Sequence, residues 1–212
     1  LNWLLMSVVN NGAVVLVILF QPELRKALEQ IGRGAIRERA AGGESARIVS
    51  EITHCMLNLS RRRVGALIVI EQRIGLKDVI ETGTSLQSEI SSALLENIFE
   101  PNTPLHDGAV VIRGDRIMAA ACILTLSEGK GISRELGTRH RAAIGITETT
   151  DAIALIVSEE TGIISMAREG RLTRHLDRAG LEQVLTALYQ PKETGLLSSL
   201  MEKTKRRKGD AA

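Results

Sequence analysis

Aromatic side chains are scarce in this 212-residue sequence, at 2% of its residues. This scarcity excludes the stacking platforms with which RNA-recognition and single-strand-binding folds hold bases. The net charge of +2 gives no broad basic surface for nucleic acid either. We therefore expect an aliphatic core and no nucleic-acid partner.

Cysteine is also rare, and the two that occur, Cys55 and Cys122, lie far apart in apolar stretches. This setting predicts buried free thiols in a reducing compartment. No Cys and His residues repeat at the spacing of zinc ligands. The sequence therefore predicts no disulfide and no zinc.

Three common signatures of nucleotide-binding and hydrolytic enzymes are absent. The segment SEGKGIS lacks the P-loop spacing, and GRGAIR departs from the glycine pattern of dinucleotide-binding folds. No Gly-x-Ser-x-Gly elbow occurs. Any phosphate chemistry must use a less general arrangement.

An uncharged apolar run occupies residues 1–20, which is long enough to cross a bilayer as a helix. Basic residues follow it at once, and by the positive-inside rule the rest of the chain lies in the cytoplasm. A buried hairpin or core helix is the alternative. We expect a transmembrane helix at 1–20 and a juxtamembrane helix and linker at 21–44.

Apolar patterns predict one globular α/β domain over residues 45–190, with a central mixed sheet flanked by helices. A basic tail follows at 191–212. Helices are expected over 45–61, across 86–98, near 142–148 and across 181–188. Strands are expected at 64–71, 109–113, 116–124, 152–157 and 162–167, with Gly114-Asp115 as a hairpin turn.

The stretch LHDGAVVI places His106 and Asp107 at the edge of a buried strand. An aspartate there can bind a metal or accept a proton, and an imidazole can add a nitrogen ligand. Gly108 would let a ligand approach the backbone closely. The alternative is an Asp-Gly turn beside a solvated histidine.

The stretch GTRHRAAIGI combines a predicted helix start with two arginines. Thr138 can cap the helix, whose N-terminus favours an anion, while Arg139 and Arg141 match phosphate oxygens. Residues two apart on a helix point in different directions, so the arginines would serve different groups. A solvated basic turn is the alternative.

Two further clusters are weaker. VSEETGIIS (157–165) leaves an apolar strand and can also be read as a plain hairpin loop. ETGTSL (81–86) places small and hydroxyl residues before an expected helix, either as an N-cap or as extra donors for an anion.

Together these motifs resemble the diadenylate cyclase family, which condenses two ATP molecules into cyclic di-AMP and releases two pyrophosphates. The resemblance rests on Asp107-Gly108-Ala109 and Arg139-His140-Arg141, with LGTRHRAA, VSEETG and ETGT around them, and covers about residues 45–190. The hydrophobic start leading into FQPELRKALEQIGRG is similar to the bacterial membrane-bound branch with three transmembrane helices, of which this chain would retain the last.

The resemblance implies a role for each matching residue. Asp107 would act on the ribose 3′-hydroxyl as a base or through a divalent metal (Mn²⁺, Mg²⁺ or Co²⁺), which His106 would share. Gly108 would let the nucleotide lie against the backbone. The remaining ATP-site residues would be Thr138, Arg139, His140 and Arg141 on the triphosphate, Ser158 and Glu160 at the phosphate or metal edge, Ile123 and Leu124 at adenine, and Gly83 and Thr84.

It also implies partners. Two domains must face each other as a homodimer, because one domain binds one ATP and the product needs two new bonds. A membrane regulator and phosphoglucosamine mutase are further partners of the family. The alternatives are a membrane-tethered nucleotide sensor without catalysis and a metal-dependent phosphohydrolase, although few further ligands are available for the latter.

Overall fold

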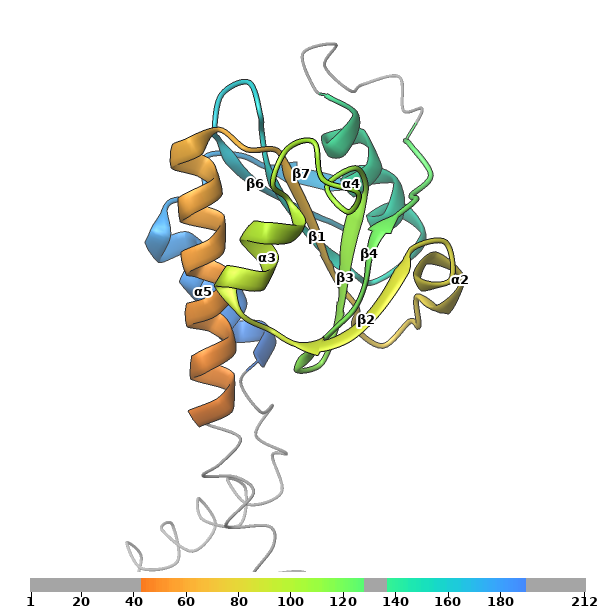
Figure 1. Cartoon of the computed structure of the whole chain (residues 1–212), viewed down its shortest axis with the longest axis horizontal. Coiled ribbons are helices and arrows are strands. Elements are labelled where there is room, and N and C mark those ends of the chain that lie inside the picture. Colours follow the sequence, from red (N-terminus) through yellow and green to blue (C-terminus); the bar gives the residue numbers. More distant parts are fainter. Residues whose placement is uncertain (1–42, 128–136, 190–212) are drawn as a thin grey trace, which may run out of the picture. The chain divides into compact units, whose positions relative to one another are not determined.

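A mixed seven-stranded sheet lies at the centre of the computed structural model, which describes residues 43–127 and 137–189 (Figure 1). Its strand order is β2-β4-β3-β1-β5-β6-β7. β1 and β3 are parallel and the other neighbouring pairs are antiparallel, which confirms the predicted sheet. The strands are β1 (Ala66–Ile70), β2 (Thr84–Glu89), β3 (Ala109–Arg113), β4 (Arg116–Cys122), β5 (Ile153–Val157), β6 (Ile164–Arg168) and β7 (Arg171–Thr173).

Helices cover both faces of the sheet (Figure 1). One apolar cluster packs the helix over residues 43–62, α3 and α5 against one face, and a second packs α4 against the other. The labelled helices are α2 (Lys77–Ile80), α3 (Ser92–Ile98), α4 (Thr138–Thr149) and α5 (Arg178–Tyr189).

β1 is buried along its whole length, as its uninterrupted apolar run predicts. Successive side chains point to opposite faces, so Ile68 joins the first cluster and Leu67 the second. Its neighbours β3 and β5 are also apolar and buried, apart from the exposed Arg113 at the end of β3. The three strands form a rigid centre, and the residues that precede β3 and follow β5 are held by it.

The predicted helix across 86–98 is wrong in its first half. Residues 84–89 form edge strand β2, and the helix α3 starts only after Ser91, whose side chain accepts a hydrogen bond from the Leu94 N–H. Leu86, Ile90 and Leu94 recur every four residues, a spacing that fits one face of a helix and one face of a strand equally. The interval from Leu86 to Ile90 runs along β2 to just past its end, and the interval from Ile90 to Leu94 leads into α3.

Several predictions concern residues that the structure does not describe. The spanning helix at 1–20, the linker at 21–44 up to residue 42, and the tail at 191–212 fall in this group. Within 43–127 and 137–189, no helix has the length and apolar character needed to cross a bilayer. Both cysteines are buried and free, as predicted.

Glu71 ties the chain that leaves β1 to the end of β3. Its carboxylate accepts hydrogen bonds from the Leu76 N–H at 2.8 Å and from the Arg113 guanidinium at 2.9 Å, and only 8% of the side chain is exposed. Burial alone would raise the pKa of Glu71, but these hydrogen bonds outweigh it and lower the pKa. The carboxylate is therefore charged and stabilising at neutral pH.

We expect Arg113→Ala to lower the free energy of unfolding by about 1–3 kcal/mol at neutral pH, because it leaves a buried carboxylate short of partners. The Glu71 pKa is lowered in the folded protein, so this stabilisation is present above its ordinary value of 4.5 and is lost as the pH falls through the lowered value. Urea denaturation measures the effect, with the exposed Arg171→Ala on β7 as control. Equal losses in both variants, or a loss that persists in acid, would contradict the assignment.

Candidate active site

The edge of β3 presents an aspartate and a histidine together. Asp107 is exposed, and His106 is half-buried with its Nδ1 2.6 Å from the Thr103 carbonyl oxygen. Because a carbonyl oxygen only accepts, Nδ1 carries a proton, and in the neutral imidazole Nε2 is the nitrogen with a lone pair. His106 can therefore offer Nε2 to a metal or a proton beside the Asp107 carboxylate.

The structure shows a further reason for glycine at residue 108, besides the predicted close approach of a ligand to the backbone. Its φ is 137°, and a Cβ at this position would lie 2.6 Å from the Ala121 carbonyl carbon. Ala121 itself has a φ of 54°, where β4 bulges against β3. The space into which a Cβ would point is filled by β4, so glycine at this position sets the course of the backbone that carries Asp107. Gly108 also lines a cavity beside this edge, and its predicted close contact with a nucleotide stays a prediction.

A cavity of about 220 Å³ opens beside this edge and collects residues from three segments. The segment before β3 contributes Asp107 and Gly108, the chain after β4 contributes Ile123 and Leu124, and α4 contributes Thr138 and Arg139. The structure thus brings together six of the residues predicted from separate motifs. Leu67 and Leu126, which the sequence did not single out, add to the apolar wall.

The apolar side of this cavity is formed by a segment that leaves the sheet. β4 ends at Cys122, two residues earlier than predicted, and the Ile123 side chain is 72% exposed. Its N–H donates to Thr82 Oγ1 at 3.0 Å. Ile123 therefore offers the cavity its side chain rather than its backbone donor.

Arg141 forms hydrogen bonds with the segment that follows β4 and is not among the residues that line the cavity. Its Nε and Nη2 both lie 3.3 Å from the Ser127 carbonyl oxygen, and the Ser127 N–H donates back to the Arg141 carbonyl. The segment also crosses α4 so closely that a Cβ at Gly145 would clash with the Thr125 carbonyl oxygen. Arg139 bonds to Glu159 and Arg141 to Ser127, so the two side chains have different partners, and a phosphate contact of each stays a prediction.

The start of α4 differs from the prediction in its cap. Gly137 is the N-cap and Thr138 is the first helical residue, with no side-chain hydrogen bond to the cap. No threonine hydroxyl therefore fills the first turn, and its leading N–H groups are left for another acceptor. Arg139 follows directly, so backbone donors and a guanidinium lie together at the cavity.

A second, much smaller cavity of about 30 Å³ lies behind Arg139 and is lined by His140, Ser158 and Glu160. His140 is 5% exposed, and its Nε2 has no hydrogen-bond partner among the described residues. Burial, helped by the nearby charge of Arg174 and opposed by Glu160, lowers the pKa of His140. The imidazole is therefore neutral at pH 7.

Two residues beside Arg139 were missed in the sequence. Glu159 accepts a hydrogen bond from Arg139 Nη1 at 2.6 Å, and Gly65 lies directly beneath the pair. Glu159 stands between two residues that had been singled out, so its position in VSEETG was a usable signal. Nothing in the local sequence marks Gly65, because its neighbours come from distant segments.

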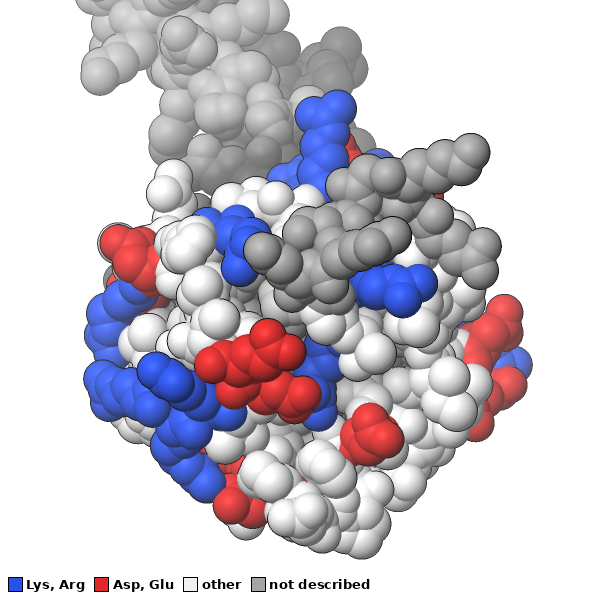
Figure 2. Space-filling model, turned by 90° about the horizontal axis from the view of Figure 1, so that it is seen from above, with Lys and Arg blue, Asp and Glu red and all other residues white. Residues whose placement is uncertain are grey.

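The end of the molecule seen from above carries charges of both signs (Figure 2). Asp and Glu side chains gather near the middle of this face with Lys and Arg beside them, and uncharged surface adjoins them. This mixed field agrees with the small net charge of the chain.

Comparison with known proteins identifies the family. Residues 53–172 match the family described as DisA bacterial checkpoint controller nucleotide-binding. The chain is 49% identical over 193 residues to Cyclic di-AMP synthase CdaA of Bacillus subtilis (strain 168), covering 90% of this chain and 71% of that protein. The chain belongs to the diadenylate cyclase family. A diadenylate cyclase of Listeria monocytogenes is 46% identical over 187 residues, or 87% of this chain and 68% of the relative.

Two solved structures with similar sequences have the same fold. DacA from Staphylococcus aureus, determined as a double mutant, gives a TM-score of 0.68 at 46% identity and covers 69% of this chain and 97% of that one. A hypothetical membrane spanning protein from Bacillus cereus gives a TM-score of 0.59 at 48% identity, covering 60% and 63%. The mixed α/β architecture is therefore shared within the diadenylate cyclase family.

The donors at the edge of β3 fit a divalent ion only in part. Within the described ranges, no group of three or more His, Cys, Asp and Glu side chains is arranged to hold a metal. His106 Nε2 and the Asp107 carboxylate supply a nitrogen and an oxygen. Ions such as Mg²⁺ are commonly held by one or two carboxylates plus substrate phosphates and water. The pair fits an ion that binds together with the nucleotide.

Two predicted ATP-site residues of this diadenylate cyclase do not reach the cavity. Thr84 pairs with Ala120 in the sheet, and a Cβ at Gly83 would lie 2.5 Å from both the Ala120 carbonyl oxygen and Cys122 Sγ. The expected helix start at 81–86 is therefore wrong. These residues begin strand β2, and Gly83 allows that strand to lie close against β4.

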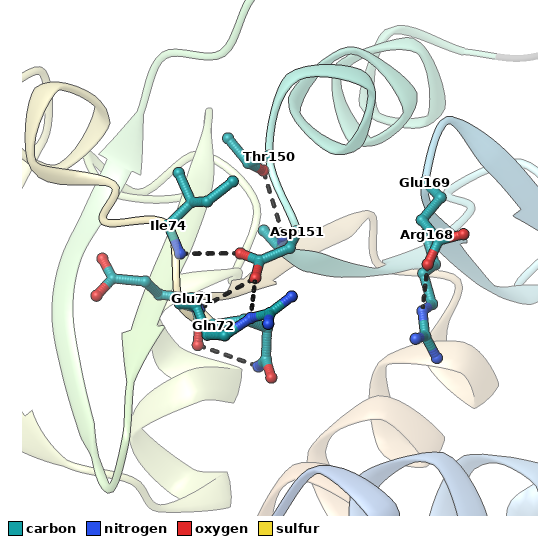
Figure 3. Close-up of polar contacts among 9 residues, drawn as sticks. Glu71, Gln72, Ile74, Thr150, Asp151, Arg168 and Glu169 are labelled. Atoms are coloured by element: carbon teal, nitrogen blue, oxygen red, sulfur yellow. Dashed lines mark hydrogen bonds and ion pairs between the residues drawn. The ribbon is translucent and has the colours of Figure 1, made fainter.

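A larger cavity of about 590 Å³ lies at the other end of β1 and β5, away from the family motifs. Its charged groups largely satisfy one another, because Asp151 accepts hydrogen bonds from Arg73 and the Ile74 N–H, and Arg168 pairs with Glu169 (Figure 3). By contrast, the 220 Å³ cavity holds Asp107 and Arg139 without pairing them to each other. The smaller cavity is therefore the candidate active site.

Proposed function

We propose that this chain condenses two ATP molecules into cyclic di-AMP and releases two pyrophosphates. The observation that carries this proposal is the meeting of Asp107 and Arg139 at one cavity, from the two family motifs. A carboxylate and a phosphate-binding cation beside an apolar wall are the parts that nucleotidyl transfer needs. The close relatives named as cyclic di-AMP synthases support the same reaction.

Asp107 acts on the nucleophile. Its carboxylate accepts the proton of a ribose 3′-hydroxyl as that oxygen attacks the α-phosphorus of the other ATP. One P–O bond forms, the bond to pyrophosphate breaks, and the leaving group carries away the negative charge. A second, equivalent step closes the ring and releases the second pyrophosphate.

The start of α4 binds the triphosphate. The N–H groups of Thr138 and Arg139 and the Arg139 guanidinium lie together where charge builds up on the leaving pyrophosphate. His140, Ser158 and Glu160 line the small cavity behind Arg139 and support that end of the site. Arg141 contributes by holding the segment after β4 through the Ser127 carbonyl.

Ile123 and Leu124 pack against adenine. Their side chains line the cavity beside Leu126, and all three follow β4. An apolar wall of this kind offers dispersion contact to the base. Gly83 and Thr84 act indirectly, by placing β2 beside the strand from which this wall emerges.

A divalent ion (Mn²⁺, Mg²⁺ or Co²⁺) would be held by His106 and Asp107. When bound, such an ion supplies charge neutralisation at the phosphates and lowers the pKa of a bound hydroxyl. The fixed Nδ1–H tautomer of His106 leaves Nε2 directed to this task. Asp107 keeps the attacking ribose oriented in the same place.

The active unit is a face-to-face homodimer. The product needs two equivalent new bonds, and each chain supplies one Asp107 and one Arg139 to one cavity. Asp107 is exposed at its edge, where an ATP held by a second copy can reach it. Two-fold symmetry then makes both bonds with the same residues.

The protein works at the bacterial cell membrane, with the catalytic domain in the cytoplasm. The apolar run at 1–20 and the basic residues after it support this placement, as does the likeness to a membrane spanning protein of Bacillus cereus. A membrane regulator and phosphoglucosamine mutase are the proposed protein partners, by family resemblance.

Product analysis tests the proposed reaction. The full chain is incubated with ATP and Mn²⁺, Mg²⁺ or Co²⁺, and the products are separated by chromatography. Cyclic di-AMP that forms only when a metal is present is the expected result. ADP or AMP would favour a phosphohydrolase, and ATP binding without any product would favour a nucleotide sensor.

A further inference from the structure

The Arg139 guanidinium is held by two residues outside the Asp107-Gly108-Ala109 and Arg139-His140-Arg141 motifs. Its Nη1 donates to Glu159 Oε2 at 2.6 Å, and the two groups also form an ion pair. Its side chain is only 20% exposed, while that of Glu159 is 63% exposed. The arginine is thus partly withdrawn from water, and its geometry is fixed by the protein to a greater degree than that of a surface ion pair.

Gly65 forms the floor of this arrangement. A Cβ at residue 65 would lie 2.5 Å from Arg139 Nη1 and 2.8 Å from Glu159 Oε2. The ion pair therefore packs directly on the backbone at the entrance to β1. Any side chain at residue 65 would push the guanidinium away, although its backbone is free of the positive φ that would itself demand glycine.

The Arg139 guanidinium has further N–H donors besides Nη1, and these need a hydrogen-bond acceptor. Nε is buried and has no hydrogen-bond partner among the described residues. Glu159 occupies Nη1, and an arginine presents its donors as a planar fork that matches two phosphate oxygens. The Nε–Nη2 edge of the fork is consequently left for an acceptor that comes with the ligand.

We propose that Glu159 is a positioning residue, which with Gly65 as its floor fixes the Arg139 guanidinium so that its Nε–Nη2 edge receives the triphosphate. Glu159 does not touch the nucleotide. It holds the fork before ATP arrives, so that little side-chain entropy is lost on binding. This inference rests on the proposed function, because it assigns the ligand of Arg139 as the triphosphate.

Two variants test the role by different routes. Glu159→Ala removes the partner of Nη1, and Gly65→Ala displaces the guanidinium while leaving the partner in place. We expect each to raise the KM for ATP roughly ten- to hundredfold, with kcat lowered less and with no change in melting temperature. Glu159→Gln, which keeps an oxygen acceptor, should recover part of the loss.

Matched controls exist for both variants. Glu100→Ala removes a carboxylate that pairs with Arg62, also at 2.6 Å, and Gly75→Ala adds a Cβ where no atom lies within 4 Å. Both should keep the wild-type KM. A wild-type or lowered KM in Glu159→Ala would overturn the inference, and so would a melting temperature that falls without a rise in KM.

Binding of 3′-deoxyadenosine triphosphate separates this inference from the proposed function. This analogue lacks the attacking hydroxyl, so calorimetry measures its affinity without turnover. Weaker binding by Glu159→Ala and Gly65→Ala supports the positioning role even if the wild-type protein makes no cyclic di-AMP, which would contradict only the reaction. Unchanged binding in an active enzyme would overturn the positioning role alone.

Discussion

Asp107→Asn should abolish cyclic di-AMP formation, lowering kcat by about a thousandfold or more, while ATP still binds. Asparagine keeps the shape of the side chain but can neither accept the 3′-hydroxyl proton nor offer a charged oxygen to a metal. The residues proposed to bind the triphosphate lie at the start of α4, in another segment, and are unchanged in this variant. Chromatography of products and calorimetry with 3′-deoxyadenosine triphosphate measure the two effects.

Asp115→Asn is the matched control, because it also neutralises an exposed aspartate beside a glycine, at the turn between β3 and β4. It should retain wild-type activity. Residual activity of Asp107→Asn within tenfold of wild type would contradict the role of Asp107. Loss of analogue binding in the same variant would instead place Asp107 in nucleotide binding.

Dilution of the wild-type protein should abolish cyclic di-AMP formation, as the Asp107→Asn substitution should. If each chain binds one ATP and two chains are needed for the two bonds, the rate per chain falls in proportion to concentration once the dimer dissociates. Binding of 3′-deoxyadenosine triphosphate per chain should persist, because each cavity belongs to one chain. Activity and mass are measured across the same dilution series.

Adding an excess of the Asp107→Asn chain to a dilute wild-type sample provides a control with a chemical readout. Mixed dimers have one working aspartate and form one of the two bonds, so a linear dinucleotide should accumulate in place of the ring. Constant activity per chain in a sample shown to be monomeric would contradict the dimer requirement.

The strands at the centre of the fold were predictable because they are uniformly apolar. The strand at 109–113 and the start of the next at 116 agree with the structure, since Gly114 has a φ of 58° and suits a tight turn. The edge strand β2 was not predictable from spacing alone, because its exposed face gives a weak pattern. Tertiary pairing with β4 decides its conformation.

The residues of the candidate site also fall into those that the sequence predicted and those that it could not predict. Asp107 and Arg139 were found from their residue types and from the buried segments beside them. The packing of Gly83 and Gly108 against β4 could not be predicted, because the atoms beside both glycines come from a strand that is distant in the sequence. Gly65 could not be found, since its importance depends on two side chains that meet only in the folded chain.

Mass balance of the reaction tests the central claim most directly. With purified full-length chain, metal and ATP, the account predicts that every two ATP consumed give one cyclic di-AMP and two pyrophosphates, with no orthophosphate. A fixed ratio of these products throughout the reaction would establish paired nucleotidyl transfer. Release of orthophosphate with ADP, or of one pyrophosphate per AMP, would contradict it.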